Sequence, residues 1–293
     1  MNNKNVTEFF NWAAENDNFR RDSIGDDFVL IENPGISPCL NKPFKVDVFA
    51  GILCTKGYMK GTVNLKQYQA SGPFIFVVLP GQILEMEELS SDFDGNFIVI
   101  SQHFSSEALH FIHNGSHSLV KLLKQKPYSS VSQDNLNSLL SFFQMLQNTV
   151  RAVENPHRIE IITHLMKALS LKMGYEYEKK TAEMPLTKQE MIVDEFLQLI
   201  NIHFAKHRNV EYYATQMSFN PKYLSKVVRE TSGFTASEWI DRRIVLESKA
   251  LLLSTNLTIQ QISDLLTFPN QSFYGKFFKR LTGMSPKDYR NGF

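Results

Sequence analysis

The spacing of apolar positions along the chain changes near residue 131. Before that point, short β-branched or aromatic segments alternate with Gly, Pro, Asn and Asp, which is typical of strands. The clearest of these segments are 45–49, 61–65, 74–79 and 96–100. Several short strands at close spacing predict a small barrel or sandwich for residues 1–130. After residue 131, apolar residues recur at spacings of three and four, which predicts helices.

Two helices are predicted between the strand-rich region and the C-terminal part. The first is indicated by apolar residues from Leu136 to Val150, and the second covers 158–173 and ends at Gly174. Residues 175–185 are polar and charged and end in Pro185, so we interpret them as a linker. The expected organisation is therefore an N-terminal domain (1–130), a helical dimerisation region (131–174), the linker (175–185) and a helical C-terminal domain (186–293).

The C-terminal domain contains a repeat. Residues 210–219 (VEYYATQMSF) align with residues 259–268 (IQQISDLLTF) at an offset of 49. Residues 222–237 (KYLSKVVRETSGFTAS) then align with residues 272–287 (SFYGKFFKRLTGMSPK) at an offset of 50. Matched positions agree in kind, as in Ala214 with Ser263 and Gly233 with Gly283. Agreement over so many positions indicates a structural repeat.

Each copy of the repeat predicts a helix-turn-helix unit, at about 203–233 and 258–283. A short helix is followed by a three- or four-residue turn and a second helix. Thr258 with Gln261 forms a potential capping box, and Asn220 and Asn270 stand where second helices begin. Two further helices are expected to start at Thr235 with Glu238 and at Ser285-Pro286 with Asp288.

The second helix of each unit is predicted to carry one core face and one cationic face. At 100° per residue the core arcs contain an aromatic or aliphatic set, namely Tyr223, Leu224, Val227 and Val228 in the first unit and Phe273, Tyr274, Phe277 and Phe278 in the second. Basic and small polar residues face outward, as expected of helices that enter a DNA groove. The candidate base-reading residues are Lys222, Ser225, Lys226, Gln271, Ser272 and Lys276.

Other basic residues are candidates for DNA phosphate contacts. They are Arg229, Arg242, Arg243, Lys279 and Arg280, with Lys249 as a further possibility, and a role in solubility alone explains Arg242, Arg243 and Lys249 equally well. Residues 235–253 predict one helix of roughly 28 Å, long enough to hold two recognition helices about one duplex turn apart. Gly275 lies within a recognition helix, where either close approach to the groove or indifference to helix propensity could account for it.

The C-terminal residues closely resemble the DNA-binding domain of the AraC/XylS family of transcription regulators. The resemblance covers about 185–293 and is sharpest in ISDLLTFPNQSFYGKFFKRLTGMSPKDYR, from Ile262 to Arg290. Thr267 departs from the pattern, because family members often have Gly there. The resemblance implies seven helices, sequence-specific binding of promoter DNA, usually for activation, and RNA polymerase as a partner. The N-terminal half resembles the family's cupin-like sensor domain more faintly, through Val78-Leu79-Pro80-Gly81-Gln82.

Charge and composition agree with an anionic partner for the C-terminal domain. The whole chain has a net charge of +1, but residues 185–293 carry an excess of four basic residues and residues 1–184 an excess of three acidic ones. The longest apolar run, 74–79, is too short to cross a bilayer. Two cysteines, Cys39 and Cys54, exclude a disulfide framework and a Cys-based zinc site, and we expect reduced buried thiols. A cytoplasmic protein without a membrane partner is expected.

The N-terminal domain offers little catalytic chemistry. Residues 44–100 contain no histidine, which disfavours a His-ligated metal in a barrel. Surface positions explain His103, His110, His113 and His117 better than a zinc site does, and a solvated loop explains Glu85, Glu87, Glu88, Asp92 and Asp94 better than a calcium site does. We therefore expect no metal, no cofactor and no enzymatic activity, but a small-molecule effector in an aromatic pocket. Candidate lining residues are Phe49, Tyr58, Phe74, Phe76 and Phe97, each of which core packing explains at least as well.

The sequence thus predicts an α+β protein of two domains, with a cupin-like barrel or sandwich and flanking helices before an all-α domain with two helix-turn-helix units joined by a long helix. The expected function is that of a ligand-responsive, dimeric transcription regulator that binds promoter DNA and activates transcription. Two alternatives stay open at this point. One is a DNA-architectural protein without sequence preference, and the other is a cupin enzyme tethered to DNA.

Overall fold

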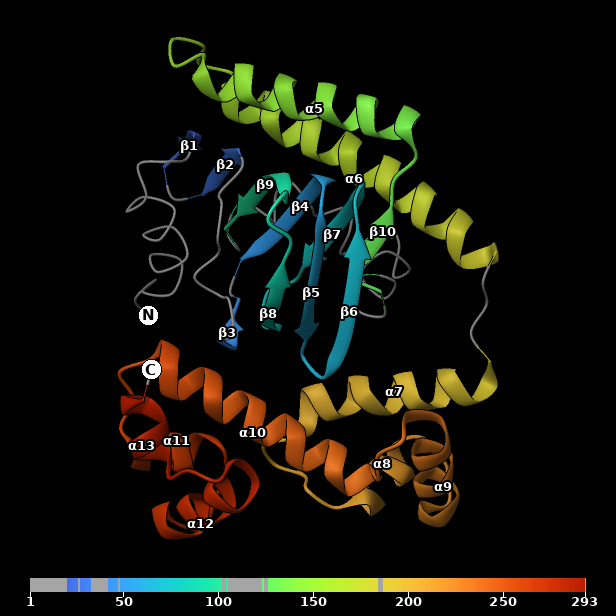
Figure 1. The fold of residues 1–293 in the computed structure, drawn as a ribbon, viewed down its shortest axis with the longest axis vertical. Coiled ribbons are helices and arrows are strands. Elements are labelled where there is room, and N and C mark those ends of the chain that lie inside the picture. Colours follow the sequence, from blue (N-terminus) through green and yellow to red (C-terminus); the bar gives the residue numbers. More distant parts are fainter. Residues whose placement is uncertain are drawn as a thin grey trace. The chain divides into compact units, whose positions relative to one another are not determined.

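The computed structural model describes residues 20–25, 27–32, 42–46, 48–101, 104, 123, 126–183 and 187–292. The chain divides into two compact units, one made of most residues up to 183 and the other built around residues 185–293 (Figure 1). The first unit holds the two long helices and the strands other than the one at residues 44–45, and the second unit is mainly helical. This confirms the predicted α+β fold class.

The described strands form two sheets. One has six strands in the order β1-β2-β9-β4-β7-β10, and the other has four in the order β3-β8-β5-β6. The five pairs of the six-stranded sheet are antiparallel, and so is the β5–β8 pair of the other sheet. The strands are β1 Arg20–Ile24, β2 Phe28–Glu32, β3 Phe44–Lys45, β4 Phe49–Lys56, β5 Tyr58–Val63, β6 Lys66–Ser71, β7 Phe74–Val78, β8 Ile83–Leu89, β9 Asp94–Ile100 and β10 Tyr128–Ser130.

The sequence located some of these strands and misjudged one. Segments 74–79 and 96–100 correspond to β7 and β9, and segment 61–65 overlaps β5. The single strand expected over 45–49 is wrong, because β3 ends at Lys45 in one sheet and β4 begins at Phe49 in the other. Between them the Val46 N–H donates to the Gln82 carbonyl at 2.9 Å and the Val46 carbonyl accepts from the Gly81 N–H at 2.7 Å. These bonds hold the bend at which the chain changes sheets.

Two helices, α5 Gln133–Arg151 and α6 Arg158–Glu183, pack on one face of the six-stranded sheet (Figure 1). Phe143 and Leu146 of α5 and Ile162 of α6 share a buried core with Phe49 and Ile100 of the sheet. The predicted end of the second helix at Gly174 is wrong, because α6 continues to Glu183 through most of the residues expected to form a linker. Glu and Lys, which dominate that stretch, are good helix formers, so their polarity did not indicate a loop.

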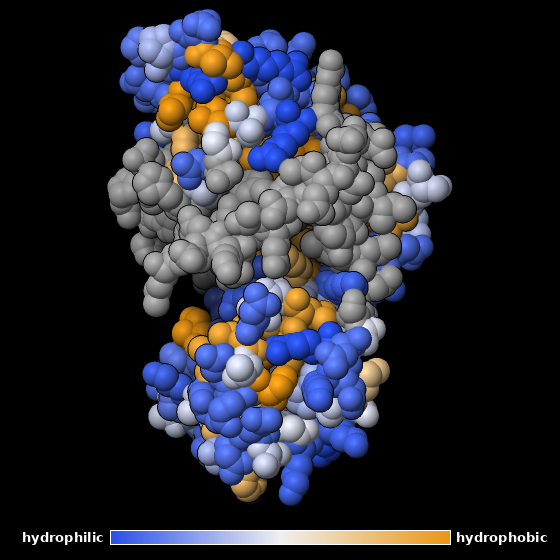
Figure 2. All heavy atoms as spheres, turned by 90° about the vertical axis from the view of Figure 1, so that its left-hand side faces the viewer, coloured by the Kyte–Doolittle hydropathy of each residue, from blue (hydrophilic) through white to orange (hydrophobic). Residues whose placement is uncertain are grey.

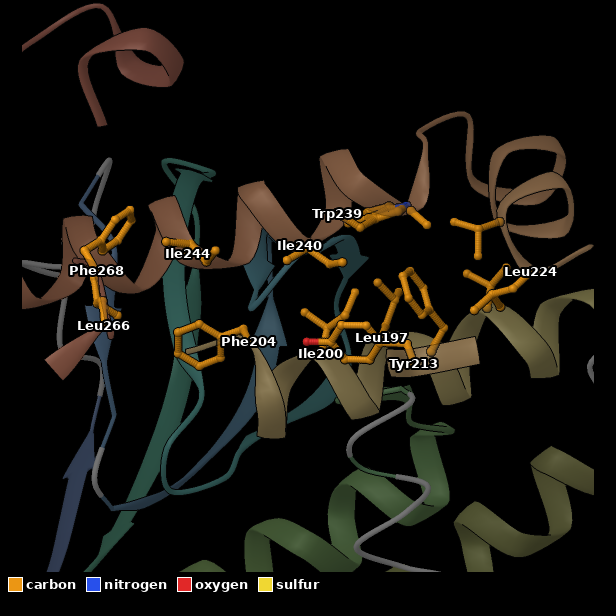
Figure 3. Packing of buried hydrophobic residues seen from close by; sticks show 14 of the residues in the cluster. Leu197, Ile200, Phe204, Tyr213, Leu224, Trp239, Ile240, Ile244, Leu266 and Phe268 are labelled. Carbon is orange, nitrogen blue, oxygen red and sulfur yellow. The ribbon is translucent and has the colours of Figure 1, made fainter. Parts of the chain in front are cut away.

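The second unit contains the seven helices that the family resemblance implies, within residues 187–292. They are α7 Lys188–His203, α8 Val210–Gln216, α9 Pro221–Ser232, α10 Ala236–Ser254, α11 Ile259–Leu265, α12 Gln271–Thr282 and α13 Pro286–Asn291. In Figure 3, Trp239, Ile240 and Ile244 of α10 lie along the residues of α7 that include Leu197 and Ile200. The shorter helices of this unit therefore pack around α10. No helix in the described ranges combines the length and apolarity that a bilayer crossing requires.

Candidate nucleic-acid interface

The first helix-turn-helix unit consists of α8, a turn and α9. Tyr213 and Ala214 of α8 are fully buried, and the small side chain of Ala214 lets the two helices approach. The turn ends at Asn220, whose side-chain oxygen accepts a hydrogen bond from the Lys222 N–H at 2.9 Å and so caps α9. Gly233, with φ of 79°, ends α9 in the left-handed conformation that glycine adopts without strain.

The second unit repeats this construction with α11, a turn and α12. Thr258 and Gln261 form the predicted capping box at the start of α11. Ser263 is buried where Ala214 is buried in the first unit. Asn270 caps α12 by accepting from the Phe273 N–H at 3.0 Å, and Gly283 ends it with φ of 81°. The predicted start signals of α10 and α13, at Thr235 and Ser285, are confirmed as well.

The backbones of the two turns match bond for bond. The Phe219 N–H donates to the Ala214 carbonyl at 2.8 Å, and the Phe268 N–H donates to the Ser263 carbonyl at 2.9 Å. One residue in each turn has a positive φ although it is not glycine, Ser218 in the first and Thr267 in the second. The sequence repeat is therefore a structural repeat at the level of individual hydrogen bonds.

The inner faces of the recognition helices differ from the prediction at one position in each helix. Leu224 and Val228 of α9 and Tyr274 and Phe278 of α12 are fully buried, as expected. The assignment of Tyr223 and Phe273 to the core is wrong, because they are 46% and 60% exposed. Their Cα positions lie at the edge of the predicted apolar arc, and the neighbouring helices of such a small unit do not cover that edge. Each recognition helix thus presents an exposed aromatic side chain at the same repeat position.

The predicted base-reading residues lie on the outside of these helices. Lys222 and Lys226 of α9 are exposed, Ser225 is half-buried, and Gln271, Ser272 and Lys276 of α12 are exposed. In α9, Lys226 lies 3.9 Å from Glu230, and both side chains are exposed, so the pair is weak in water. Gln271 and Ser272 form the first turn of α12, where backbone N–H groups have no helical acceptor and favour an anionic partner.

The remaining cations of the outer faces are exposed as well. They are Arg229 of α9 and Lys279 and Arg280 of α12, the latter 3.5 Å from Asp241 of α10. Burial raises the pKa of Asp241, opposed by Arg280 and Arg208, which lower it. A phosphate would compete with this carboxylate for Arg280, since the Arg280 side chain is 67% exposed. The faces that the sequence marked as cationic are accessible to a polyanion.

The two adjacent arginines of α10 have opposite environments. Arg242 is exposed, and its guanidinium stacks on the Phe234 ring at 3.6 Å from the ring centroid. Arg243 is 3% exposed, so its prediction as a phosphate contact is wrong. Its guanidinium donates to the Glu247 carboxylate and to the Asn201 side chain, each at 2.9 Å. Burial would raise the pKa of Glu247, but Arg243 and Lys45, which both bond to this carboxylate, oppose burial and hold the pKa below its usual range. Arg243 therefore links α10 to α7 through hydrogen bonds inside the domain.

Arg208 is a positioning residue that the sequence analysis missed. It precedes α8, but its guanidinium donates to the Leu266 carbonyl in the turn of the second unit. It also stacks on Phe268 of that turn, with 3.7 Å between the guanidinium carbon and the ring centroid. Burial lowers the pKa of Arg208, and Asp241 opposes this. Arg208 thus ties the start of one unit to the turn of the other.

The acidic cluster is not the solvated loop that the sequence predicted, because Glu85, Glu87 and Glu88 lie on β8 and Asp94 begins β9. Lys60 lies 3.2 Å from Glu87, Lys56 lies 3.5 Å from Asp92, and the Tyr58 hydroxyl bonds to Glu88. Among the residues that the structure describes, no three His, Cys, Asp or Glu side chains are placed to share a metal ion. Cys54 is buried, which raises the pKa of its thiol to about 12. Cys39 and the histidines at 103, 110, 113 and 117 lie outside the described residues.

The five residues predicted to line an effector pocket do not lie together around one cavity. The N-terminal unit contains an apolar cavity. Of the five predicted residues, only Phe49 is among those that line it. Phe74, Phe76 and Phe97 are buried on the opposite face of the six-stranded sheet, and Tyr58 belongs to the other sheet. Apolar residues occupy both faces of the six-stranded sheet, so the sequence pattern could not indicate which face borders a cavity.

Comparison with known proteins places the repeat in a family. Residues 213–292 match a family model described as a helix-turn-helix domain. The chain is 28% identical over 96 residues to the arabinose operon regulatory protein of Salmonella typhimurium, covering 32% of this chain and 34% of that protein. It is 28% identical over 119 residues to the HTH-type transcriptional activator AarP of Providencia stuartii, covering 41% of this chain and 85% of that protein.

A solved structure shares the same region. The C-terminal domain of AraT, a response regulator from Geobacillus stearothermophilus, is 27% identical, with a TM-score of 0.35, and covers 36% of this chain and 89% of that chain. Across five of the curated relatives, the matched region spans only 13% to 39% of the relative's length. The likeness to the curated relatives therefore concerns the C-terminal unit, and residues 213–292 match a helix-turn-helix domain.

Proposed function

We propose that this protein is a transcription regulator that binds promoter DNA in a sequence-specific manner through α9 and α12. The observation that carries the proposal is the duplicated unit, in which two recognition helices are capped, turned and packed alike and expose basic residues on their outer faces. The first turns of both helices offer donors for base edges, and the cations further along suit phosphates. A helix of the length of α10 spans roughly 28 Å, which suits two successive major-groove segments on one face of the duplex.

Selection from a random library of duplex DNA, with the full chain at physiological salt, tests this proposal. The expected result is a motif with two sub-sites about ten base pairs apart. Lys276→Ala is expected to cost roughly 1–3 kcal/mol of binding free energy and to relax specificity at one position of its sub-site. Lys188→Ala, which removes an exposed lysine outside both units, is the matched control and is expected to leave the motif unchanged.

The alternatives give different results in the same experiment. Uniform recovery of all duplexes, with an affinity that falls steeply with salt, would support an architectural protein without sequence preference. Equal weakening by Lys276→Ala on every sequence would make Lys276 a phosphate contact only. Absence of any duplex recovery would refute the DNA-binding proposal.

We further propose that the regulator works in the cytoplasm as a homodimer and activates transcription with RNA polymerase. The dimer is assigned to α5 and α6, where Met145, Ile159 and Leu171 are about half exposed. Figure 2 shows apolar residues gathered among hydrophilic ones at the top of the view, in the region of these helices. Exposed apolar clusters of this kind favour association. Sedimentation of the full chain and of Leu171→Glu tests the dimer, and transcription from a promoter carrying the selected motif tests activation.

A small-molecule effector bound in the N-terminal unit completes the proposal. The sheet architecture, with a buried apolar interior and two helices on one face, suits a ligand-binding domain that precedes a DNA-binding one. An effector would act by favouring one of several existing arrangements of the chain. Metal analysis of the purified protein distinguishes this proposal from a DNA-tethered enzyme, since stoichiometric metal would favour the enzyme.

A further inference from the structure

A cavity of about 140 Å³ lies between the six-stranded sheet and the helices α5 and α6. Side chains alternate along each strand, so every second residue of β4, β7 and β9 faces these helices. Leu53, Val77 and Ile98 border the cavity from the sheet. Val77 and Ile98 are only half-buried although they lie on inner strands of the sheet, which shows that the helices leave part of this face uncovered.

The helices complete the cavity with large apolar side chains. Phe142 and Leu146 of α5 and Met166 and Met173 of α6 are among its lining residues. Methionine side chains are flexible and adapt to ligands of different shape. The cavity is partly open to solvent, so without a ligand its apolar side chains are exposed to water, which is unfavourable. An apolar ligand that fills the cavity removes that surface from water.

The lining indicates the chemical class of that ligand. None of the lining residues is charged, and the polar ones among them are Asn96 and Ser170. The Ser170 hydroxyl donates to the Lys167 carbonyl at 2.8 Å, so its hydrogen is already used within α6. A charged group would lose its hydration here without gaining an ionic partner. The volume of about 140 Å³ accommodates an apolar ring of the size of benzene, which sets the size of a suitable ligand.

The position of the cavity on α6 connects it to the C-terminal unit through the chain. Met173 borders the cavity, and α6 continues for ten residues from there to Glu183, roughly 15 Å at the helical rise. Gly174 directly follows Met173 and weakens the helix at that point relative to Ala. A ligand that repacks Met166 and Met173 would therefore act on the helix that leads into the DNA-binding domain.

We propose that this cavity, on the helix-facing side of the sheet, is the effector site and takes an uncharged, mainly hydrocarbon molecule of about the size of a monosubstituted benzene. The regulatory part of this inference rests on the proposed function of the chain as a DNA-binding regulator. The binding part does not, because it depends on the cavity alone.

Fluorobenzene is a suitable probe, with its ¹⁹F resonance observed in the presence of the full chain. We expect saturable broadening of the resonance by the native chain. Val77→Phe, which fills the cavity, is expected to abolish it. Ile159→Phe adds the same ring on α6 at a position 49% exposed and not among the lining residues, and is expected to bind like the native chain. Thermal unfolding of both variants shows whether they are folded. Saturable broadening that survives in folded Val77→Phe, or none with the native chain, overturns the site.

Two further measurements test the ligand class and the coupling. Sodium benzoate is expected to bind at least tenfold more weakly than fluorobenzene, and equal binding would overturn the assignment to uncharged ligands. Saturating fluorobenzene is expected to change the dissociation constant for the selected duplex at least fivefold, within the usual range of allosteric coupling. Binding of fluorobenzene without that change would overturn the effector role. Failure of the ligand-free chain to bind any duplex would refute the proposed function while leaving the probe measurement intact.

Discussion

Ser218 and Thr267 occupy equivalent positions in the two helix-turn-helix turns and share a left-handed backbone, with φ of 57° and 58°. Residues other than glycine avoid this region because Cβ approaches the following carbonyl oxygen, and a β-branched residue such as Thr tolerates it least. The turn geometry therefore explains why Gly is common at the position of Thr267 in the AraC/XylS family. This chain keeps the geometry and accepts strain at both turns.

Thr267→Gly is expected to raise the free energy of unfolding by up to about 1.6 kcal/mol. Relief of the left-handed strain is worth about 1–2 kcal/mol, and the extra freedom of glycine in the unfolded chain offsets about 0.4–1 kcal/mol. Urea denaturation of the full chain measures the difference. Thr267→Ala keeps a Cβ and is the control, for which no gain is expected. A loss of stability in Thr267→Gly would show that the Thr side chain contributes more than the strain costs.

Gly275→Ala is expected to stabilise α12 by about 1 kcal/mol, because Gly is that much less favourable than Ala inside a helix. A Cβ built on Gly275 meets no atom within 4 Å, so nothing inside the protein requires glycine there. If the helix backbone approaches the floor of a DNA groove at this point, the same change lowers affinity for the selected duplex. Measuring stability and affinity on one preparation separates the two explanations, since unchanged affinity would leave only indifference to helix propensity.

Arg243→Ala is expected to lower the free energy of unfolding by about 3 kcal/mol, the lower end of the cost of breaking a buried ion pair, because Glu247 loses its buried partner and keeps only the half-exposed Lys45. Arg242→Ala removes the same side chain one position earlier and is expected to cost under about 1 kcal/mol, the worth of its stacking on Phe234. Only Arg242→Ala is expected to reduce the salt dependence of DNA binding, by about one unit of slope. Equal stability of the two variants would contradict the burial argument.

Phe273→Ala is expected to weaken binding to the selected duplex and to relax the preference for thymine at one position. The ring of Phe273 is exposed beside Gln271 and Ser272 at the start of α12, and an apolar side chain in the major groove recognises the thymine methyl group. Leu265→Ala removes another exposed apolar side chain of the same unit, from α11, and serves as the control. Replacement of thymine by uracil at the preferred position should reproduce the effect of Phe273→Ala on the native chain.

The repeat made the C-terminal unit predictable from sequence. Caps at Thr235, Thr258 and Ser285 are local signals, and each stands within three residues of the backbone group it satisfies. The same locality explains the errors. The burial of Arg243 depends on Asn201, 42 residues away, which no spacing rule connects to it. The helical wheel predicted that Tyr223 and Phe273 are buried, because it shows only the direction in which a side chain points from its own helix. It does not show whether a neighbouring helix covers that side chain.

The N-terminal unit was less predictable for a related reason. Strand patterns located β7 and β9. Because apolar residues occupy both faces of the six-stranded sheet, the pattern could not indicate which face borders the cavity. The continuation of α6 past Gly174 depends on helix formers whose polarity resembles that of a linker. The linker prediction was wrong because composition does not show whether a polar segment continues a helix. Composition also could not show which aromatic residues border a cavity.

The bond from Arg208 to the Leu266 carbonyl has a consequence for the duplication itself. A gene segment that doubles usually yields two modules that can later be separated, shuffled or lost one at a time. Here the beginning of the first module supplies a donor and a stacking surface to the turn of the second. Excision of either copy would leave the other incomplete, so the two halves are expected to melt as one cooperative body and to be inherited together.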